Sequence, residues 1–434
     1  MTRWTNWSGL ESAEPTQVLD PRTVADVVTA ISRARESGTG VKMVGSGHSF
    51  TGISAPEHTM LRPGGLSGIL SVDRRAMTVT AGAGTLLKTL NAELERLGLS
   101  LHNMGDIAEQ TLAGAISTGT HGSGGIAAGL AAQVVGLEMV TGTGEVLAAD
   151  RTTNPEVLDL ARLGLGALGV LTSLTFAVEP LLLLQATERP IGWAELLERH
   201  DELVATHHHV DVHWFPHSEG ALLKANTRLA DDVGTARPLA PWSSWLDDEL
   251  LSNTVFGLTT RLGNRFPPVV PAVNRVSSRA LSARTYSDVA HKVFVSTRRV
   301  RFREMEYAVP RAAGLAALAE ARRVIDAHDW RIGFPVEIRT APADDVPLST
   351  AYRQDSTYLA FHVPREVDHT AYFAAMESVM RAHGGRPHWG KLHSLDATAL
   401  GELHPCLDDF TALRDRLDPD RVFANGYLRR VLGS

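Results

Sequence analysis

The segment that follows Val41 combines residue types that can hold an anionic ligand. It reads Val41-Lys-Met-Val-Gly45-Ser46-Gly47-His48-Ser49, which predicts a strand running into a tight glycine turn whose backbone amides could converge on a diphosphate. The turn is not the Rossmann fingerprint, because Phe50 stands where a third small residue is needed and the chain continues as a loop instead of opening a helix. A nicotinamide-binding fold is therefore excluded, although a glycine turn by itself is a weak signal.

A second glycine-rich segment strengthens the first. Gly105 and Asp106 precede the run Thr111-Leu-Ala-Gly114-Ala-Ile-Ser117-Thr118-Gly119-Thr120-His121-Gly122-Ser123-Gly124. Small residues and hydroxyls at this density let the backbone approach a flat or anionic ligand closely and donate hydrogen bonds to it. The two segments together could hold one large cofactor, whereas Gly124 and Gly125 taken alone fit a turn-rich loop of a sheet.

Charged residues in the second half of the chain could act on a substrate. Glu337 and Arg339 stand two apart in a segment whose alternation predicts a half-buried strand, so their side chains share one face. In a pocket, the guanidinium could stabilise a substrate oxygen that gains negative character, while the carboxylate orients it and binds substrate hydroxyls. An exposed charged strand face is the alternative. His362, in an apolar strand from Tyr358, is either a pocket residue or a satisfied core histidine.

No metal site is predicted. His207, His208 and His209 are consecutive, so on a strand their side chains would alternate faces, and we interpret them as a surface run. Cys406 is the only cysteine, which excludes an internal disulfide and a zinc cluster of cysteine ligands.

The elements that must position these residues indicate an α+β protein of two domains. Apolar periodicity predicts helices over residues 23–36, 86–97, 311–328 and 371–384, among short strands rich in Val, Thr and Gly. The composition of the sequence changes after Pro180, with more Arg and Pro and with longer predicted helices. We therefore expect one domain over residues 13–180 and a second over residues 181–434, with the active site between them.

Composition limits the partners. The 434 residues are 44% hydrophobic and 21% charged with a net charge of −7, and the basic residues are scattered, so no nucleic-acid footprint is present. The most apolar stretch, residues 163–176, is too short to span a bilayer and is predicted to be buried core. Small-molecule partners and a cytoplasmic location are expected, with a peripheral association with a membrane left open.

The motifs taken together resemble a known family. The two glycine-rich segments and Leu165-Gly-Ala-Leu-Gly-Val170 are similar to the FAD-binding, PCMH-type domain of vanillyl-alcohol-oxidase-type flavoenzymes. Four further signatures resemble the sugar-1,4-lactone oxidases and dehydrogenases of the L-gulonolactone and D-arabinonolactone type: residues 211–217, residues 301–307, Glu337-Ile-Arg339 and His388-Trp-Gly-Lys391. The resemblance covers nearly the whole chain, and its specificity lies in the combination and order of the motifs.

The resemblance implies an FAD joined covalently to His48, and a tail over residues 418–434 that returns to the FAD domain. Lys391 would place a cation beside the flavin N1 and C2 carbonyl, where charge accumulates on reduction. The implied catalytic residues are Glu337, Arg339, Lys391 and, as a weaker candidate, His362. The implied cofactor-binding residues are Gly45, Ser46, Gly47, His48, Ser49, Gly105, Asp106, Thr111, Gly114, Ser117, Thr118, Thr120, His121, Gly122, Gly124, Val170 and Lys391.

The activity implied is hydride transfer to flavin N5 from the carbon that bears the 2-hydroxyl of a sugar 1,4-lactone. Electrons then pass to O2 or to another acceptor, such as a cytochrome or a quinone. Gly105 occupies a site where this family carries glycine or a slightly larger residue that impedes oxygen, so it favours an oxidase. An alditol oxidase acting on a polyol such as xylitol is the nearest alternative, and a non-catalytic flavin- or carbohydrate-binding protein is a further one.

Overall fold

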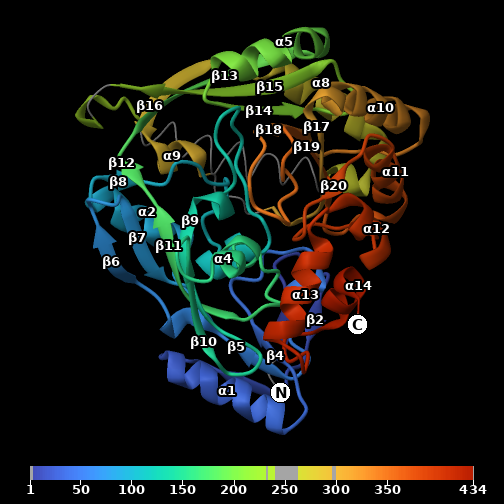
Figure 1. Cartoon of the computed structure of the whole chain (residues 1–434). Coiled ribbons are helices and arrows are strands. Elements are labelled where there is room, and N and C mark those ends of the chain that lie inside the picture. The colour runs from blue at the N-terminus through green and yellow to red at the C-terminus, as the bar shows by residue number, and fades with distance from the viewer. Residues whose placement is uncertain (1–2, 231–232, 240–261, 296–299, 434) are drawn as a thin grey trace.

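Two large β-sheets dominate the part of the chain that the computed structural model describes, residues 3–230, 233–239, 262–295 and 300–433. A five-stranded sheet lies in the first half of the chain and an eight-stranded sheet in the second, with helices packed against both (Figure 1). Adjacent strands of both sheets run antiparallel, as expected where helices and strands do not alternate regularly. The predicted α+β class is confirmed. No helix of the described residues is long and apolar enough to cross a membrane.

The chain begins with a hairpin and a small parallel sheet. The hairpin joins β1 (Trp4–Thr5) to β2 (Ser12–Ala13), and the sheet has the order β3 (Gln17–Leu19), β5 (Thr59–Leu61), β4 (Val41–Met43). Helix α1 (Val24–Glu36) connects β3 to β4 and buries Val27 and Ile31. Thr23 fixes its start through a capping box with Asp26. The helix predicted from residue 23 is thus confirmed to within one residue.

The five-stranded sheet carries the core of the first half. Its order is β10 (Val146–Asp150), β9 (Val134–Val140), β11 (Val170–Ala177), β7 (Thr78–Gly82) and β6 (Ile69–Asp73). The helices of this half are α2 (Leu87–Arg96), α3 (Leu112–Ser117) and α4 (Pro155–Ala161), and β8 (Leu99–Ser100) pairs with β12 (Glu179–Pro180). Most of the apolar side chains over residues 163–176 are buried, as predicted.

The eight-stranded sheet runs across the second half. Its order is β16 (Arg284–Val289), β13 (Leu183–Gly192), β15 (Gly220–Leu229), β14 (His209–Trp214), β18 (Val336–Ala341), β19 (Ser356–Pro364), β17 (Phe302–Pro310) and β20 (Arg386–Pro387). Helices α5 (Trp193–Thr206), α8 (Val270–Arg279), α10 (Gly314–Ala327) and α11 (Thr370–Ala382) cover its outer face (Figure 1). The helices predicted over 311–328 and 371–384 correspond to α10 and α11, and the Glu337 segment is a strand as predicted.

The two faces of this sheet differ sharply in polarity because side chains alternate along each strand. Val212, Ile338 and Phe361 belong to the apolar face that packs under the helices. The opposite face is charged, and its register forms two rows across the central strands β14, β18, β19 and β17. One row is Asp211, Arg339, Tyr358 and Ala308, and the next is His213, Glu337, Ala360 and Glu306. Glu304 and His362 lie opposite each other one step further along.

The C-terminal segment returns to the first half of the chain. Helices α12 (Ala397–Leu403), α13 (Leu407–Leu417) and α14 (Gly426–Leu432) run from the eight-stranded sheet toward β4 (Figure 1). The backbone N–H of Val41 donates to the Val422 carbonyl at 2.8 Å. The amide of Asn425 donates to the carbonyls of residues 52, 53 and 55 at 2.9–3.1 Å.

The interpretation of the three consecutive histidines as a surface run is wrong. His209 is buried at the start of β14, and its ring packs edge-on against Phe294 of α9 (Ala290–Phe294) at 4.5 Å between centroids. His208 Nδ1 lies 3.0 Å from His209 Nδ1, and burial lowers the pKa of His208 to about 4. His208 and His209 lie against the first half of the chain, at His102 and Gly124, which a run of identical residues in the sequence could not reveal.

Candidate functional site: a cofactor cavity that meets a charged cavity

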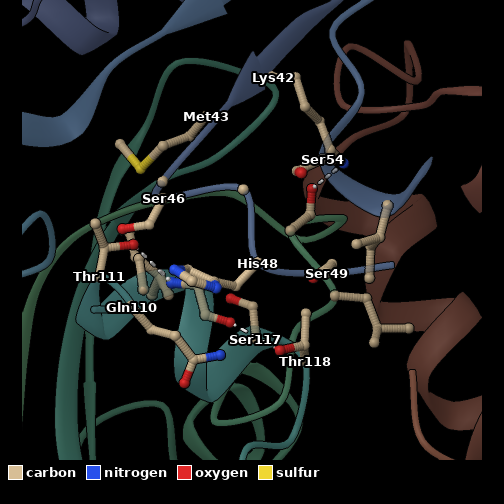
Figure 2. Close-up of a pocket in the computed structure, with 18 of the residues that line it drawn as sticks. Lys42, Met43, Ser46, His48, Ser49, Ser54, Gln110, Thr111, Ser117 and Thr118 are labelled. Carbon is tan, nitrogen blue, oxygen red and sulfur yellow. Dashed lines mark hydrogen bonds between the residues drawn. The ribbon is translucent and has the colours of Figure 1, made fainter. Parts of the chain in front are cut away.

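A cavity of about 810 Å³ lies between the loop after β4 and the segment that includes α3. Figure 2 shows Ser46, His48 and Ser49 of the first segment opposite Thr111, Ser117 and Thr118 of the second. The two glycine-rich segments singled out in the sequence therefore form opposite walls of one space. The remaining walls come from residues 165–171 and from Phe423 of the C-terminal segment.

The backbone of residues 45–49 is suited to an anion. Among the described residues, no hydrogen bond uses the N–H groups of these five consecutive residues, although their neighbours Val44 and Phe50 both donate. Unpaired amides of this kind need an acceptor from water or a ligand. Gly45 allows the loop to approach α3, because a Cβ there would lie 2.2 Å from the Thr111 hydroxyl oxygen. These features fit the diphosphate of an FAD.

His48 stands where this cavity meets a second one, and lines both. Its ring stacks on Trp7 at 5.9 Å between centroids, and no hydrogen bond of the described chain uses either of its ring nitrogens. Burial lowers the pKa of His48, and the nearby charge of Lys391 lowers it further against the opposing effect of Glu109. The imidazole is therefore held neutral, which is the nucleophilic form.

The second cavity, of about 610 Å³, lies between the two halves of the chain. Gly105, Asp106, Thr120 and His121 line it from the first half, and the second half contributes charged and aromatic residues: Phe302, Glu306, Arg339, His388 and Lys391. It shares His48, Ser49, Gln110 and Thr118 with the larger cavity. One elongated ligand could thus extend through both, with its far end among the charges.

Arg339 is held by three carboxylates. Its Nε donates to Asp211 at 2.8 Å, and its Nη2 lies 3.2 Å from Glu337 and 3.5 Å from Asp106. Burial opposes its charge, but these carboxylates raise the pKa of Arg339 well above the ordinary value. Asp211 also accepts from Ser123 at 2.9 Å and thereby ties the cofactor segment to the sheet. The guanidinium is permanently charged and fixed in orientation.

Lys391 lies between two buried glutamates. Its ammonium donates to Glu304 in a short contact and lies 3.9 Å from Glu306. Glu306 in turn contacts His121 Nε2 through a short hydrogen bond. Burial alone would raise the pKa of both glutamates, but the cations beside them lower it overall. The sequence motif of residues 301–307 contained both glutamates, yet nothing in their spacing distinguished them from an exposed strand face.

The histidines of the site have defined hydrogen positions. His388 Nδ1 accepts from the Gly390 N–H at 3.0 Å, and burial lowers the pKa of His388 to about 4, so the neutral ring carries its hydrogen on Nε2. His362 Nδ1 lies 3.2 Å from the Pro335 carbonyl and donates to it, and His362 Nε2 lies 3.5 Å from Glu304.

Glu304, Glu337 and His362 bring three possible ligand atoms within 4.8 Å of one another. Lys391 and Arg339 already neutralise the two carboxylates, so a metal ion would have to displace them. The geometry therefore favours a site for an organic cofactor and substrate over a site for a resident metal ion.

The structure brings together most residues singled out in the sequence. Of the expected cofactor residues, all except Gly122 and Gly124 line one of the two cavities. Gly122 instead approaches the Met104 carbonyl, 2.3 Å from where its Cβ would lie, and the Gly124 N–H donates to Thr340 of β18. Glu337 and His362 are buried beside the charged cavity and are not among the described residues that line it. Cavity-lining residues that the sequence did not predict as site residues include Lys42, Gln110, Glu306 and Phe423, although Glu306 and Phe423 belong to segments that resemble the family.

The fold and these two cavities place the chain in the class of FAD-binding oxidoreductases. A solved structure of cholesterol oxidase from B. sterolicum superposes with a TM-score of 0.84 over 99% of this chain and 96% of that chain, at 19% identity. Residues 15–150 match the FAD binding domain family, as the glycine-rich segments predicted. The class is thus settled by fold and sequence together.

The chain belongs to the D-arabinono-1,4-lactone oxidase family, whose match covers residues 174–431. It is 39% identical to an L-gulono-1,4-lactone dehydrogenase of Mycobacterium tuberculosis over 99% of both chains. It is 33% identical to an L-gulonolactone oxidase of Scyliorhinus torazame, over 98% of this chain and 97% of that one. The resemblance inferred from the motifs is confirmed.

Proposed function

We propose that this chain oxidises the 2-hydroxyl of a sugar 1,4-lactone, of the L-gulono- or D-arabinono- type, with FAD as the electron acceptor. The observation that carries the proposal is the junction at His48, where a cavity suited to FAD opens into one walled by Arg339 and Lys391. Bound FAD would supply the hydride acceptor, flavin N5. The names of the similar proteins support the lactone as substrate.

We assign the following roles to the charged cavity. The contacts that fix Arg339 use Nε and Nη2, so Nη1 is the group that we assign to the substrate oxygen that becomes a carbonyl. Glu337 positions the guanidinium and also holds His213 at 2.9 Å. Asp106 lines the cavity 3.5 Å from Arg339 and is the carboxylate that accepts the hydroxyl proton. Lys391 supplies positive charge where the cofactor becomes more negative.

We further propose that residues 13–180 hold the cofactor and that residues 181–434 supply the substrate face. The tail from residue 418 supports the cofactor side, since Lys42 on β4 donates to the Phe423 carbonyl at 3.1 Å and Phe423 lines the larger cavity. A covalent bond between His48 and the flavin is part of the proposal, supported by the neutral, unpaired imidazole. A cytoplasmic location is also proposed, because one cysteine, Cys406, allows no internal disulfide.

The test begins with the absorbance spectrum of the purified protein before and after acid precipitation. Yellow colour that stays in the pellet, and that moves to the supernatant in His48→Ala, supports the covalent bond. Anaerobic L-gulono-1,4-lactone should then bleach the flavin, with xylitol as the control. Bleaching by xylitol alone would make the protein an alditol oxidase, and folded protein without flavin would refute the proposal. Recovery of colour in air identifies oxygen as an acceptor, whereas persistent bleaching identifies another acceptor.

A further inference from the structure

His121 and Glu306 form a buried pair across the two halves of the chain. His121 belongs to the second glycine-rich segment and Glu306 to β17, and their side chains are only 6% and 3% exposed. His121 Nε2 and Glu306 Oε1 are joined by a short hydrogen bond, and both residues line the charged cavity. The pair therefore lies beside the space that we assign to the flavin ring and the substrate.

The two hydrogen bonds of His121 need one more proton than a neutral imidazole and an ionised carboxylate hold together. Its Nδ1 lies 2.9 Å from the Gly122 carbonyl, which can only accept, so Nδ1 carries a hydrogen. An ionised Glu306 also only accepts, so the contact at Nε2 requires a second hydrogen. The pair as a whole is then electrically neutral.

Two further contacts indicate that this proton resides on His121. The ring stacks on Tyr358 at 3.8 Å between centroids and 25° between planes, and an aromatic face favours a cation. Burial raises the pKa of Tyr358, so this neighbour is a neutral phenol. Glu306 also lies 3.9 Å from the Lys391 ammonium, and a neighbouring cation favours the ionised form of a carboxylate.

A charged His121 would balance the charges around Lys391. Lys391 donates to Glu304 and lies 3.9 Å from Glu306. With one ammonium and two carboxylates the group would carry a net negative charge beside the cofactor cavity, which opposes the addition of electrons there. A protonated His121 brings the sum to zero.

We propose that His121, held as an imidazolium by Glu306, is a second cation of the flavin site and that it sets the reduction potential of the flavin together with Lys391. This inference rests on the proposed function and adds a role to it. His121 acts by its charge and is not required to exchange a proton with the substrate. Several other charged and titratable groups face the pair. They are Tyr358 of β19, Arg339 of β18, His388 and Lys391 of the loop after β20, and Glu304, which lies on β17 with Glu306.

The decisive measurement is the flavin midpoint potential of the holoenzyme, obtained by equilibration with reference dyes across a range of pH. His121→Gln keeps a side-chain amide that can donate to Glu306 but removes the charge. The double variant His121→Gln/Glu306→Gln removes both charges of the pair and restores neutrality. His328→Gln is the matched control, since this exposed histidine at the end of α10 donates to its own helix at 2.8 Å.

At about pH 8, His121→Gln should lower the two-electron equilibrium constant at least tenfold, or about 30 mV. This decrease in midpoint potential should become smaller as the pH falls, because the uncompensated buried carboxylate of Glu306 takes up a proton. The double variant should return close to the wild-type potential at every pH. A purely structural role for His121 would instead leave the double variant at least as impaired as the single one.

An unchanged potential in His121→Gln, or a double variant that is no better than the single one, would overturn the inference while the proposed function stands. Wild-type protein without flavin would instead remove the proposed function. If His121→Gln fails to bind flavin, 15N-labelled histidine in the wild-type protein gives an independent test. The spectrum should contain an imidazolium signal from His121 under the conditions of the potential measurement, and its absence would also refute the inference.

Discussion

Asp211 should control the reaction without touching the substrate. Its carboxylate accepts from Arg339 Nε at 2.8 Å and from the Ser123 hydroxyl at 2.9 Å, and it is not among the described residues that line the charged cavity. Asp211→Ala removes the hydrogen bond to Arg339 Nε and leaves the guanidinium held through Nη2 alone. Asp211→Asn keeps the shape and can still accept at Oδ1, but it loses the charge of the acceptor.

The expected magnitudes follow from these contacts. A hydrogen bond between charged partners contributes about 1.5–3 kcal/mol and a neutral one about 1 kcal/mol. Because about 1.4 kcal/mol is a factor of ten in rate, Asp211→Ala should lower kcat/KM by roughly 10- to 100-fold, and Asp211→Asn by only a few-fold. The loss should appear mainly in kcat. A misaligned Arg339 weakens the contact to the substrate oxygen more in the transition state than in the ground state.

The assay is steady-state reduction of an artificial acceptor by L-gulono-1,4-lactone, with flavin content measured for each variant. Asp420→Asn is the matched control, because Asp420 pairs with Arg35 on the exposed surface at 3.0 Å and such pairs contribute little. Asp211→Ala with kcat/KM within twofold of the wild type and full flavin content would refute the reasoning. A loss confined to flavin content would assign Asp211 to cofactor binding through Ser123.

Three further predictions concern oxygen access, the C-terminal segment and a buried lysine. Gly105→Ala should slow reoxidation of the reduced flavin by air severalfold, because the new Cβ would lie 3.0 Å from the His121 carbonyl oxygen in the cavity wall; stopped-flow reoxidation at the wild-type rate would contradict this. Asn425→Ala should lower the stability of the cofactor half by about 2–4 kcal/mol, because its amide donates to three carbonyls and its oxygen caps α14; an unchanged thermal midpoint would count against that estimate. Burial lowers the pKa of Lys42 from 10.5 to about 7. The unfolded chain then binds a proton that the folded protein lacks between about pH 7 and pH 10.5, so stability should rise with pH across this window relative to Lys42→Met. Parallel stability profiles of the two proteins would exclude this effect of Lys42.

The sequence by itself determined the family, the fold class and the two walls of the cofactor cavity. Residues 45–49 were informative in combination with the second glycine-rich run, because two such segments let the backbone approach one large ligand closely. Strand alternation placed Glu337 and Arg339 on one face, and apolar periodicity located the helix predicted over residues 23–36 to within one residue. These signals are local, so they survive in a single sequence.

Only the tertiary structure decided which charges act together. Asp211, Glu306 and Lys391 lie on separate elements, and the register of β14, β18, β19 and β17 determines which of them meet. The same packing placed His209 in the interior, against the expectation of a surface run, and set Glu337 behind Arg339 rather than in the cavity wall. The physical reason is that a local pattern specifies only the face of a strand on which a side chain lies. Pairing between strands and between the two halves of the chain determines its partners and its burial, and these determine its charge.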